Sequence, residues 1–281
     1  MKRFFRLRIL AKLNLLKYFN LQTILQVENR KFIIPIYNSI GLSLIYYEKD
    51  WMSDLLNELS QRNNGVFIDV GTNIGQTLIA YQLNNINGEY IGFEPNINCS
   101  NYISHLIFKN NFNNARVFNV GLSNINKLDQ LILNNASDVD PAASMITELR
   151  PGKEIYKQIN FISIKLDDFV LSSKIQKIDI IKIDVEGAEY EVIMGATDTI
   201  KKYRPVILCE MLNADSAGTI VFVQNRTKEI VKLMQELNYD IYRTIKFKNR
   251  FKKLEKIDFI TIGLYSEEDN DLCDYAFVPG K

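Results

Sequence analysis

The stretch Ile178-Asp179-Ile180-Ile181-Lys182-Ile183-Asp184-Val185-Glu186-Gly187 says more about the fold than any other part of this chain. Its run of β-branched apolar residues is typical of an interior strand of a parallel sheet. The glycine lets the chain turn, and apolar residues at helical spacing follow from Ala188. Because ligands bind beyond the carboxyl ends of parallel strands, Asp184 and Glu186 lie where we expect chemistry. The alternative is that either acid only caps the next helix.

Strands and helices alternate around this stretch. The predicted strands are Val66–Val70, Tyr90–Glu94, Arg116–Val120, Ile178–Asp184 and Pro205–Glu210, and the predicted helices are Gly75–Leu83, Asn98–Asn110, Ala188–Thr199 and Arg226–Leu237. Such alternation indicates an α/β domain with a parallel sheet covered on both faces. Three late strands without helices between them, Tyr239–Ile245, Asp258–Tyr265 and Tyr275–Val278, predict antiparallel pairing at one edge.

The first sixty residues read as an N-terminal extension, and residues 61–281 as the catalytic domain. We expect the extension to hold a basic amphipathic helix over residues 1–20, a hairpin pairing Lys31–Ile36 with Leu42–Tyr47, and a helix over Asp50–Leu59. The basic helix either contacts a membrane surface or packs on the domain. The charges that interrupt it do not fit a signal peptide.

Composition excludes several classes of protein. With 281 residues and a formal net charge of +1, the chain has no global field that would favour nucleic acid. His105 is the only histidine, which disfavours histidine-rich metal sites and a histidine base. The three cysteines are far apart and favour a reducing, cytoplasmic compartment. No apolar run reaches the ~18 residues of a membrane-spanning helix.

A glycine turn after the first parallel strand predicts a cofactor site. The segment Val66–Gln76 reads strand, turn and helix, with Gly71 and Gly75 spaced unlike the dinucleotide fingerprint. Asp69 ends the strand and would repel a pyrophosphate at the helix N-terminus. A cofactor with a cationic centre and no phosphate, S-adenosylmethionine (SAM), fits better. Glu94 ends the second strand, where an acid binds ribose hydroxyls.

With these motifs in place, the chain from Gly65 to Ile245 resembles FkbM-type SAM-dependent methyltransferases. The matching segments are Asp69-Val-Gly-Thr-Asn-Ile-Gly75, Phe93-Glu94-Pro95, Asn119-Val-Gly-Leu-Ser123, Ala143-Ser144-Met145, Leu166-Asp167-Asp168-Phe169 and Lys182-Ile-Asp-Val-Glu-Gly-Ala-Glu189. The resemblance implies a Rossmann-like class I methyltransferase fold, a seven-stranded, mostly parallel sheet with a reversed last strand. It also implies O-methylation, often of sugar or polyketide hydroxyls.

The resemblance assigns roles to individual residues. Asp69, Gly71, Asn73, Gly75 and Glu94 carry over as SAM contacts, with Thr72 in the same turn, and Asp184 and Glu186 carry over as active-site positions. Many class I enzymes bind adenine with an acid after the third strand. This chain has none there, so Asn119, Ser123 or backbone groups would serve.

Methyl transfer from a sulfonium requires alignment of the acceptor more than its activation. Asp184 is the predicted base or hydroxyl anchor, and Glu186 takes the same role or fixes the loop. Lys182, inside an apolar strand, needs a carboxylate partner. Glu210 is a predicted substrate contact, and the irregular stretch 136–158 is a candidate acceptor-binding loop.

Other readings of the same residues stay open. Asp184, Glu186 and Glu210 could hold a divalent metal, although our assignment has none. A nicotinamide-dependent dehydrogenase and a non-catalytic interaction protein with a SAM fold are the alternatives to an O-methyltransferase acting on a sugar, glycan or related metabolite.

Overall fold

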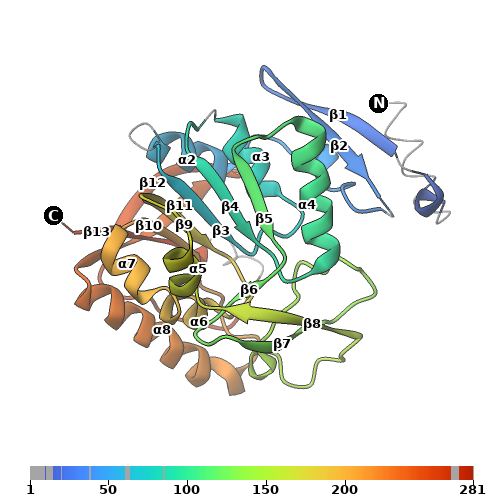
Figure 1. The fold of residues 1–281 in the computed structure, drawn as a ribbon. Coiled ribbons are helices and arrows are strands. Elements are labelled where there is room, and N and C mark those ends of the chain that lie inside the picture. Colours follow the sequence, from blue (N-terminus) through green and yellow to red (C-terminus); the bar gives the residue numbers. More distant parts are fainter. Residues whose placement is uncertain are drawn as a thin grey trace.

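A mixed eight-stranded sheet, in the order β12-β11-β13-β10-β9-β3-β4-β5, forms the centre of the molecule (Figure 1). The computed structural model describes residues 10, 15–19, 21–37, 39–60, 64–84, 86–266 and 272–280. The strands are β3 (Val66–Val70), β4 (Glu89–Phe93), β5 (Ala115–Phe118), β9 (Ile178–Ile183), β10 (Val206–Glu210), β11 (Tyr239–Phe247), β12 (Arg250–Ile257) and β13 (Asp274–Pro279).

Strand directions confirm the predicted class I methyltransferase arrangement. Strands β5, β4, β3, β9 and β10 run parallel, whereas β13 is antiparallel to both of its neighbours, β10 and β11. These seven strands are the expected sheet with its reversed last strand. The eighth strand, β12, extends the edge by pairing antiparallel with β11.

Helices cover both faces of the sheet (Figure 1). One face packs against α2 (Trp51–Ser60), α3 (Gln76–Leu83) and α4 (Ile97–Asn110), and the other against α5 (Leu166–Ser172), α6 (Glu189–Met194), α7 (Thr197–Tyr203) and α8 (Ile220–Glu236). Alternate residues of β9 serve the two cores: Ile180 belongs to the first, and Ile181 and Ile183 to the second. Burial on both sides explains the continuous apolar run of this strand.

Two helix predictions were wrong in their bounds. The single helix expected over Ala188–Thr199 is two helices, α6 and α7, since the chain breaks at Gly195 and Ala196. A Cβ at Gly195 would lie 2.0 Å from the carbonyl oxygen of Ser123, so close packing requires glycine there. Helix α8 begins at Ile220, six residues before the predicted start at Arg226.

A second, three-stranded sheet was not predicted. It consists of β6 (Gly121–Leu122), β8 (Lys157–Ile164) and β7 (Lys127–Leu133) in that order. The long connection between β7 and β8, residues 134–156, contains one short 3-10 helix, Thr147–Leu149. The irregular stretch expected over 136–158 is therefore this connection, with its last two residues in β8.

The predicted hairpin of the extension has the wrong partner. β2 (Arg30–Ile36) pairs with β1 (Leu21–Val27), and the stretch 42–47 instead contains the 3-10 helix Leu44–Tyr46. The two-residue turn between β1 and β2 makes this pairing local, with Glu28 at φ 49°. The basic helix expected over residues 1–20 lies mostly outside the described residues.

The strand expected over Asp258–Tyr265 is also wrong, because the strand of this region is β12. Lys248 and Asn249 both have positive φ, 50° and 56°, and form the tight turn between β11 and β12. The lysines of β12 interrupt the apolar pattern by which a strand is predicted, but they suit an exposed sheet edge.

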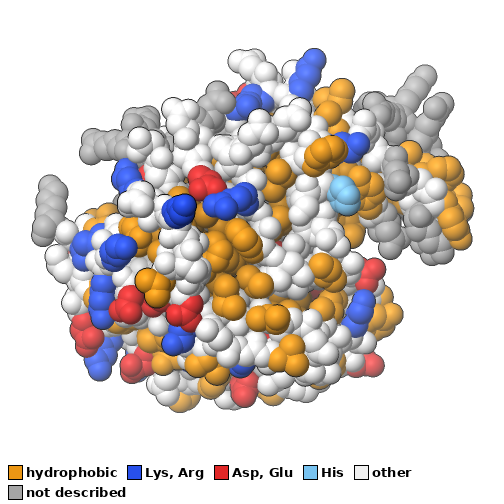
Figure 2. Space-filling view, viewed as in Figure 1, with side chains coloured by type: hydrophobic (Ala, Val, Ile, Leu, Met, Phe, Trp, Pro, Cys, Tyr) orange, Lys and Arg blue, Asp and Glu red, His pale blue; other side chains and the backbone are white. Residues whose placement is uncertain are grey.

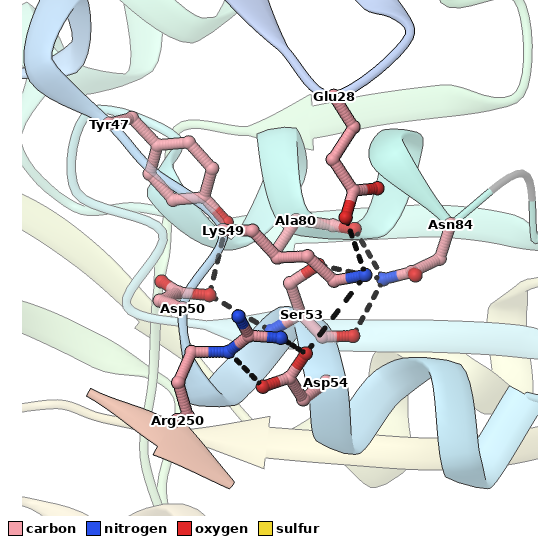
Figure 3. A network of polar contacts seen from close by, with 9 residues as sticks. All are labelled: Glu28, Tyr47, Lys49, Asp50, Ser53, Asp54, Ala80, Asn84 and Arg250. Carbon is pink, nitrogen blue, oxygen red and sulfur yellow. Dashed lines mark hydrogen bonds and ion pairs between the residues drawn. The ribbon is translucent and has the colours of Figure 1, made fainter. Parts of the chain in front are cut away.

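Helix α2 is fastened to three parts of the molecule, as Figure 3 shows. Arg250 of β12 donates to both carboxylate oxygens of Asp54, at 2.6 and 2.7 Å. Asn84, after α3, donates to the Ser53 carbonyl at 2.8 Å. Lys49, just before α2, lies 4.0 Å from Asp54 of the helix and pairs with Glu28 of the β1–β2 turn at 3.0 Å. The described part of the extension thus packs into the same core as the sheet.

Surface charge is mixed on the face shown in Figure 2, where acidic and basic side chains are interspersed and hydrophobic ones gather near the middle. This pattern agrees with the formal net charge of +1. None of the helices in the described part of the chain has the length and apolar character needed to span a bilayer.

Candidate active site

A cavity of about 360 Å³ lies at the carboxyl ends of β3, β4, β9 and β10, and the small sheet and the 134–156 connection border it. We call it the first cavity. Eight of the predicted site residues line it: Gly71, Thr72, Asn73, Glu94, Lys182, Asp184, Glu186 and Glu210. Four others, Asp69, Gly75, Asn119 and Ser123, are not part of its lining.

The turn after β3 forms one wall of the first cavity. Gly71 has φ 82°, and a Cβ there would lie 1.8 Å from the carbonyl oxygen of Asp184, so this position requires glycine. Asn73 also has a positive φ, 47°. The hydroxyl oxygen of Thr72 is buried and has no hydrogen-bond partner among the described residues. An unsatisfied buried hydroxyl beside a cavity is suited to a bound ligand.

Glu94 holds the turns after β3 and β4 together. Its Oε2 accepts from the backbone N–H of Asn73 and its Oε1 from that of Asn96, each at 2.8 Å. Burial raises the pKa of Glu94 to about 7, although these two backbone donors lower it. Glu94 therefore lies in the cavity wall, and its protonated and ionised forms are about equally populated at neutral pH.

Lys182 bridges two acids. Its Nζ lies 3.3 Å from Asp69 Oδ1 and 3.1 Å from Asp184 Oδ2, and it donates to the Gly71 carbonyl at 3.3 Å. Burial opposes its charge, yet the carboxylates of Asp184 and Asp69 raise the pKa of Lys182 above its usual value. The expected carboxylate partner is therefore present twice.

Asp69 lies behind the cavity wall. It is 0% exposed, and Tyr90 Oη donates to its second carboxylate oxygen. Burial raises the pKa of Asp69, while Lys182 and Tyr90 lower it. Asp69 acts on the cavity through Lys182, which it positions, rather than by presenting its own oxygens.

Asp184 and Glu210 form a hydrogen-bonded carboxyl pair at the ends of β9 and β10. Burial, together with the neighbouring Asp184 and Asp274 carboxylates, raises the pKa of Glu210 to about 10. Glu210 is therefore protonated at neutral pH and can share its proton with Asp184 through their hydrogen bond. With Lys182 on the other side of Asp184, the pair is held in a defined position.

Glu186 fastens the 134–156 connection to the end of β9. Arg150 Nη2 donates to its Oε2 at 2.8 Å, and Ser144 Oγ donates to its carbonyl at 2.7 Å. Burial and the nearby Asp184 raise the pKa of Glu186, while Arg150 lowers it. Its φ of 54° is unusual for a residue with a side chain.

The remaining predicted residues lie outside the lining of the first cavity and belong to the turns and elements around it. Gly75, at φ 94°, precedes α3 as its N-cap. Asn119 donates to the carbonyls of Glu94 and Pro95, at 2.9 and 3.1 Å, and so holds the turn after β4. Ser123 is 1% exposed and its N–H donates to Ile164 of the small sheet.

Several lining residues were missed. Among them are Asn96, Leu131, Asp140, Met145 and Phe161. Asp140 is held by N–H donors from Asn134 and Ala142, at 2.8 and 3.1 Å. The alternation of polar and apolar residues around Phe161 in β8 was the available signal, and it would have identified the small sheet.

Fold and site together define a class I methyltransferase. Over residues 69–241 the chain matches the family described as "Methyltransferase FkbM domain", and it belongs to that family. It is therefore a methyltransferase, and its cofactor is S-adenosylmethionine. No curated protein matches the chain.

Three similar solved structures share low identity with this chain. The FkbM methyltransferase from Methylobacillus flagellatus KT is 14% identical, with 76% of this chain and 43% of that chain covered and a TM-score of 0.45. A SAM-dependent methyltransferase from Aquifex aeolicus is 10% identical, with 82% and 89% covered and a TM-score of 0.42. An O-methyltransferase from Bacillus cereus in complex with SAH is 12% identical, with 81% and 78% covered and a TM-score of 0.42.

Proposed function

We propose that this protein transfers the methyl group of SAM to a hydroxyl oxygen of a sugar, a glycan or a related metabolite. The position of Asp184 carries the proposal. Its carboxylate is held by Lys182 at 3.1 Å, is hydrogen-bonded with protonated Glu210, and lines both the first cavity and a neighbouring one. A hydroxyl acceptor must lose a proton, and Asp184 is placed to receive it.

The first cavity suits the cofactor. The unsatisfied hydroxyl of Thr72 and the close backbone turn at Gly71 and Asn73 fit the amino-acid end, while Glu94 fits the ribose hydroxyls. When bound, SAM supplies a methyl group on a cationic sulfur. Asp69 takes part indirectly, because it holds Lys182 and thereby the orientation of Asp184.

Asp184 acts late in the reaction. An aliphatic hydroxyl is about as weakly acidic as water, so a carboxylate cannot deprotonate it beforehand. With SAM bound, the acceptor hydroxyl would become strongly acidic while its oxygen took the methyl group and the sulfur left, and Asp184 would receive the proton that the hydroxyl lost. Alignment of the acceptor can supply roughly 7–11 kcal/mol of the rate enhancement.

The metal alternative has a specific observation in its favour, since one oxygen each from Asp184, Glu186 and Glu210 lies within 4.8 Å of the others. However, Lys182 and Arg150 already pair with Asp184 and Glu186, at 3.1 and 2.8 Å. We favour metal-independent transfer, and full activity in the presence of a strong chelator is the expected result.

Methyl transfer to a panel of hydroxyl acceptors, followed with a radiolabelled methyl donor, tests the proposal. Asp184→Asn should lower kcat by about 10²- to 10⁴-fold, the usual contribution of a general base. Asp240→Asn is the matched control, because Asp240 is 40% exposed against 41% for Asp184 and also pairs with a lysine, Lys256 at 2.7 Å.

Binding of S-adenosylhomocysteine provides a separate readout. It should raise the melting temperature of both variants, whereas NAD should not. If Asp184→Asn transferred methyl groups as fast as the wild type, the assignment of Asp184 would be wrong. If no hydroxyl acceptor were methylated while S-adenosylhomocysteine still bound, O-methylation itself would be wrong.

A further inference from the structure

A second cavity, of about 270 Å³, adjoins the first one on the far side of the Asp184–Glu210 pair. It lies between α2, β11 and β13, and Trp51, Thr244, Lys246, Asp274 and Tyr275 line it. Lys182, Asp184 and Glu210 line both cavities. A molecule in the second cavity would therefore meet the first cavity at the residues to which we assign proton transfer.

The charges of the second cavity disfavour an anion. Lys246 pairs with Asp274 at 2.6 Å, and Lys182 pairs with Asp184 at 3.1 Å. The charges of both lysines are therefore already compensated by carboxylates of this chain. Asp50, a further acid in the wall, accepts from Tyr47 and Ser53 (Figure 3). A phosphate or carboxylate entering here would meet more acids than bases.

The remaining lining combines the aromatic ring of Trp51 with hydroxyl groups, those of Thr244 and Tyr275. Trp51 lines the cavity, and Lys246 Nζ lies 4.5 Å from the centroid of its ring. The network of Figure 3 fixes α2 through Arg250 and Asp54 and thereby places Trp51. The cavity is smaller than the ~300–1,000 Å³ typical of sites for drug-sized ligands, which suits a single small ring.

We propose that the second cavity is the acceptor subsite and that it takes one uncharged, polyhydroxylated ring, with the reacting hydroxyl against Asp184 and Glu210. This inference rests on the proposed O-methyltransferase function. It places acceptor recognition on α2, β11 and β13 instead of the 134–156 connection, which borders the first cavity.

Trp51 is the only tryptophan of the chain, so the emission of the protein reports on this cavity. Protein saturated with S-adenosylhomocysteine should change its emission when titrated with neutral methyl hexopyranosides, and less with methyl hexopyranosiduronic acids. For any glycoside that the enzyme methylates, Trp51→Ala should raise the KM for that glycoside roughly ten- to hundredfold. This is the effect of losing a buried aromatic contact. Affinity for S-adenosylhomocysteine should stay the same.

The matched control is Phe108→Ala, which removes a 74% exposed aromatic side chain on α4. Unchanged emission with every glycoside, or an unchanged KM in Trp51→Ala, would place the acceptor elsewhere and leave O-methylation intact. An equal response to the uronic acids would overturn the charge argument. An emission change without methylation of any glycoside would uphold the cavity as a sugar site and overturn the proposed reaction.

Discussion

Replacing Lys182 by methionine tests the ion-pair arrangement on which the site is built. The side chain of Lys182 is 8% exposed and that of Asp69 is 0% exposed, so the substitution leaves a buried carboxylate without its cation and with only the Tyr90 hydrogen bond. Loss of one member of a buried pair costs about 3–5 kcal/mol. The side chain of Asp184 is 41% exposed, so water can solvate its carboxylate. Loss of its pair with Lys182 should therefore add little to the destabilisation.

The free energy of unfolding, measured with urea and circular dichroism, should therefore fall by about 3–5 kcal/mol, or roughly two to four powers of ten in the folding equilibrium. Asp69→Asn removes the stranded charge, so the double variant should recover at least half of this loss. Lys253→Met is the control, because Lys253 is 60% exposed and its pair with Glu255 is on the surface. Its free energy of unfolding should stay close to that of the wild type, because exposed ion pairs contribute little.

Two results would refute this reasoning. One is a Lys182→Met variant as stable as Lys253→Met. The other is a double variant in which the losses of Lys182→Met and Asp69→Asn simply add, because residues in one network should show a coupling energy of ~0.5–3 kcal/mol.

Four further outcomes are expected. Affinity for S-adenosylhomocysteine, measured by calorimetry, should fall as the pH drops below about 7, because burial raises the pKa of Glu94 to about 7 and the ionised form accepts ribose hydrogen bonds better. Without ligand, thermal stability should fall as the pH rises from about 4.5 to about 7, since folded Glu94 and Glu189, each with a pKa of about 7, keep protons that the unfolded chain has lost. Gly71→Ala should abolish S-adenosylhomocysteine binding or folding, whereas Gly152→Ala, also at φ 82° but with no atom within 4 Å of the new Cβ, should cost only ~1–2 kcal/mol in urea unfolding. Arg150→Ala should speed proteolytic cleavage within residues 134–156, because it removes the 2.8 Å contact to Glu186.

Each expectation has a clear contradiction. If Glu94→Gln kept the pH profile of binding, another group would control it. Stability that rose with pH between about 4.5 and 7 would contradict the sign derived from protons retained in the folded state. A Gly71→Ala variant as stable as Gly152→Ala would refute the steric argument. Unchanged cleavage of Arg150→Ala would show that Glu186 does not fasten the connection.

The parallel half of the sheet could be predicted because each strand there is an apolar run followed by a turn residue. At the antiparallel edge, β11 and β13 could be predicted, but β12 could not. β12 is rich in lysine, and its pairing depends on two residues with positive φ between it and β11. The small sheet has short or half-exposed strands, and only the alternation in β8 marks it.

Site residues at the ends of the parallel strands could likewise be predicted, whereas those that depend on packing between distant segments could not. Residues at strand ends, such as Glu94, Asp184 and Glu210, are placed at the cavities by topology alone. Trp51 comes from a helix of the extension, so nothing in the local sequence connects it with Glu210. The burial of Asp69 behind Lys182 depends on side-chain packing across β3 and β9, which the order of residues does not reveal.

Arg250 and Asp54 join segments that are 196 residues apart. This clasp ties α2 to the β11–β12 hairpin, and neither segment supplies the turn after β3 or the end of β4. The segments that this ion pair joins are therefore different from those that form the predicted cofactor site. Substitutions in α2 and this hairpin that kept the Arg250–Asp54 pair would change the second cavity, and they would have to preserve the core that α2 shares with α3 and β3.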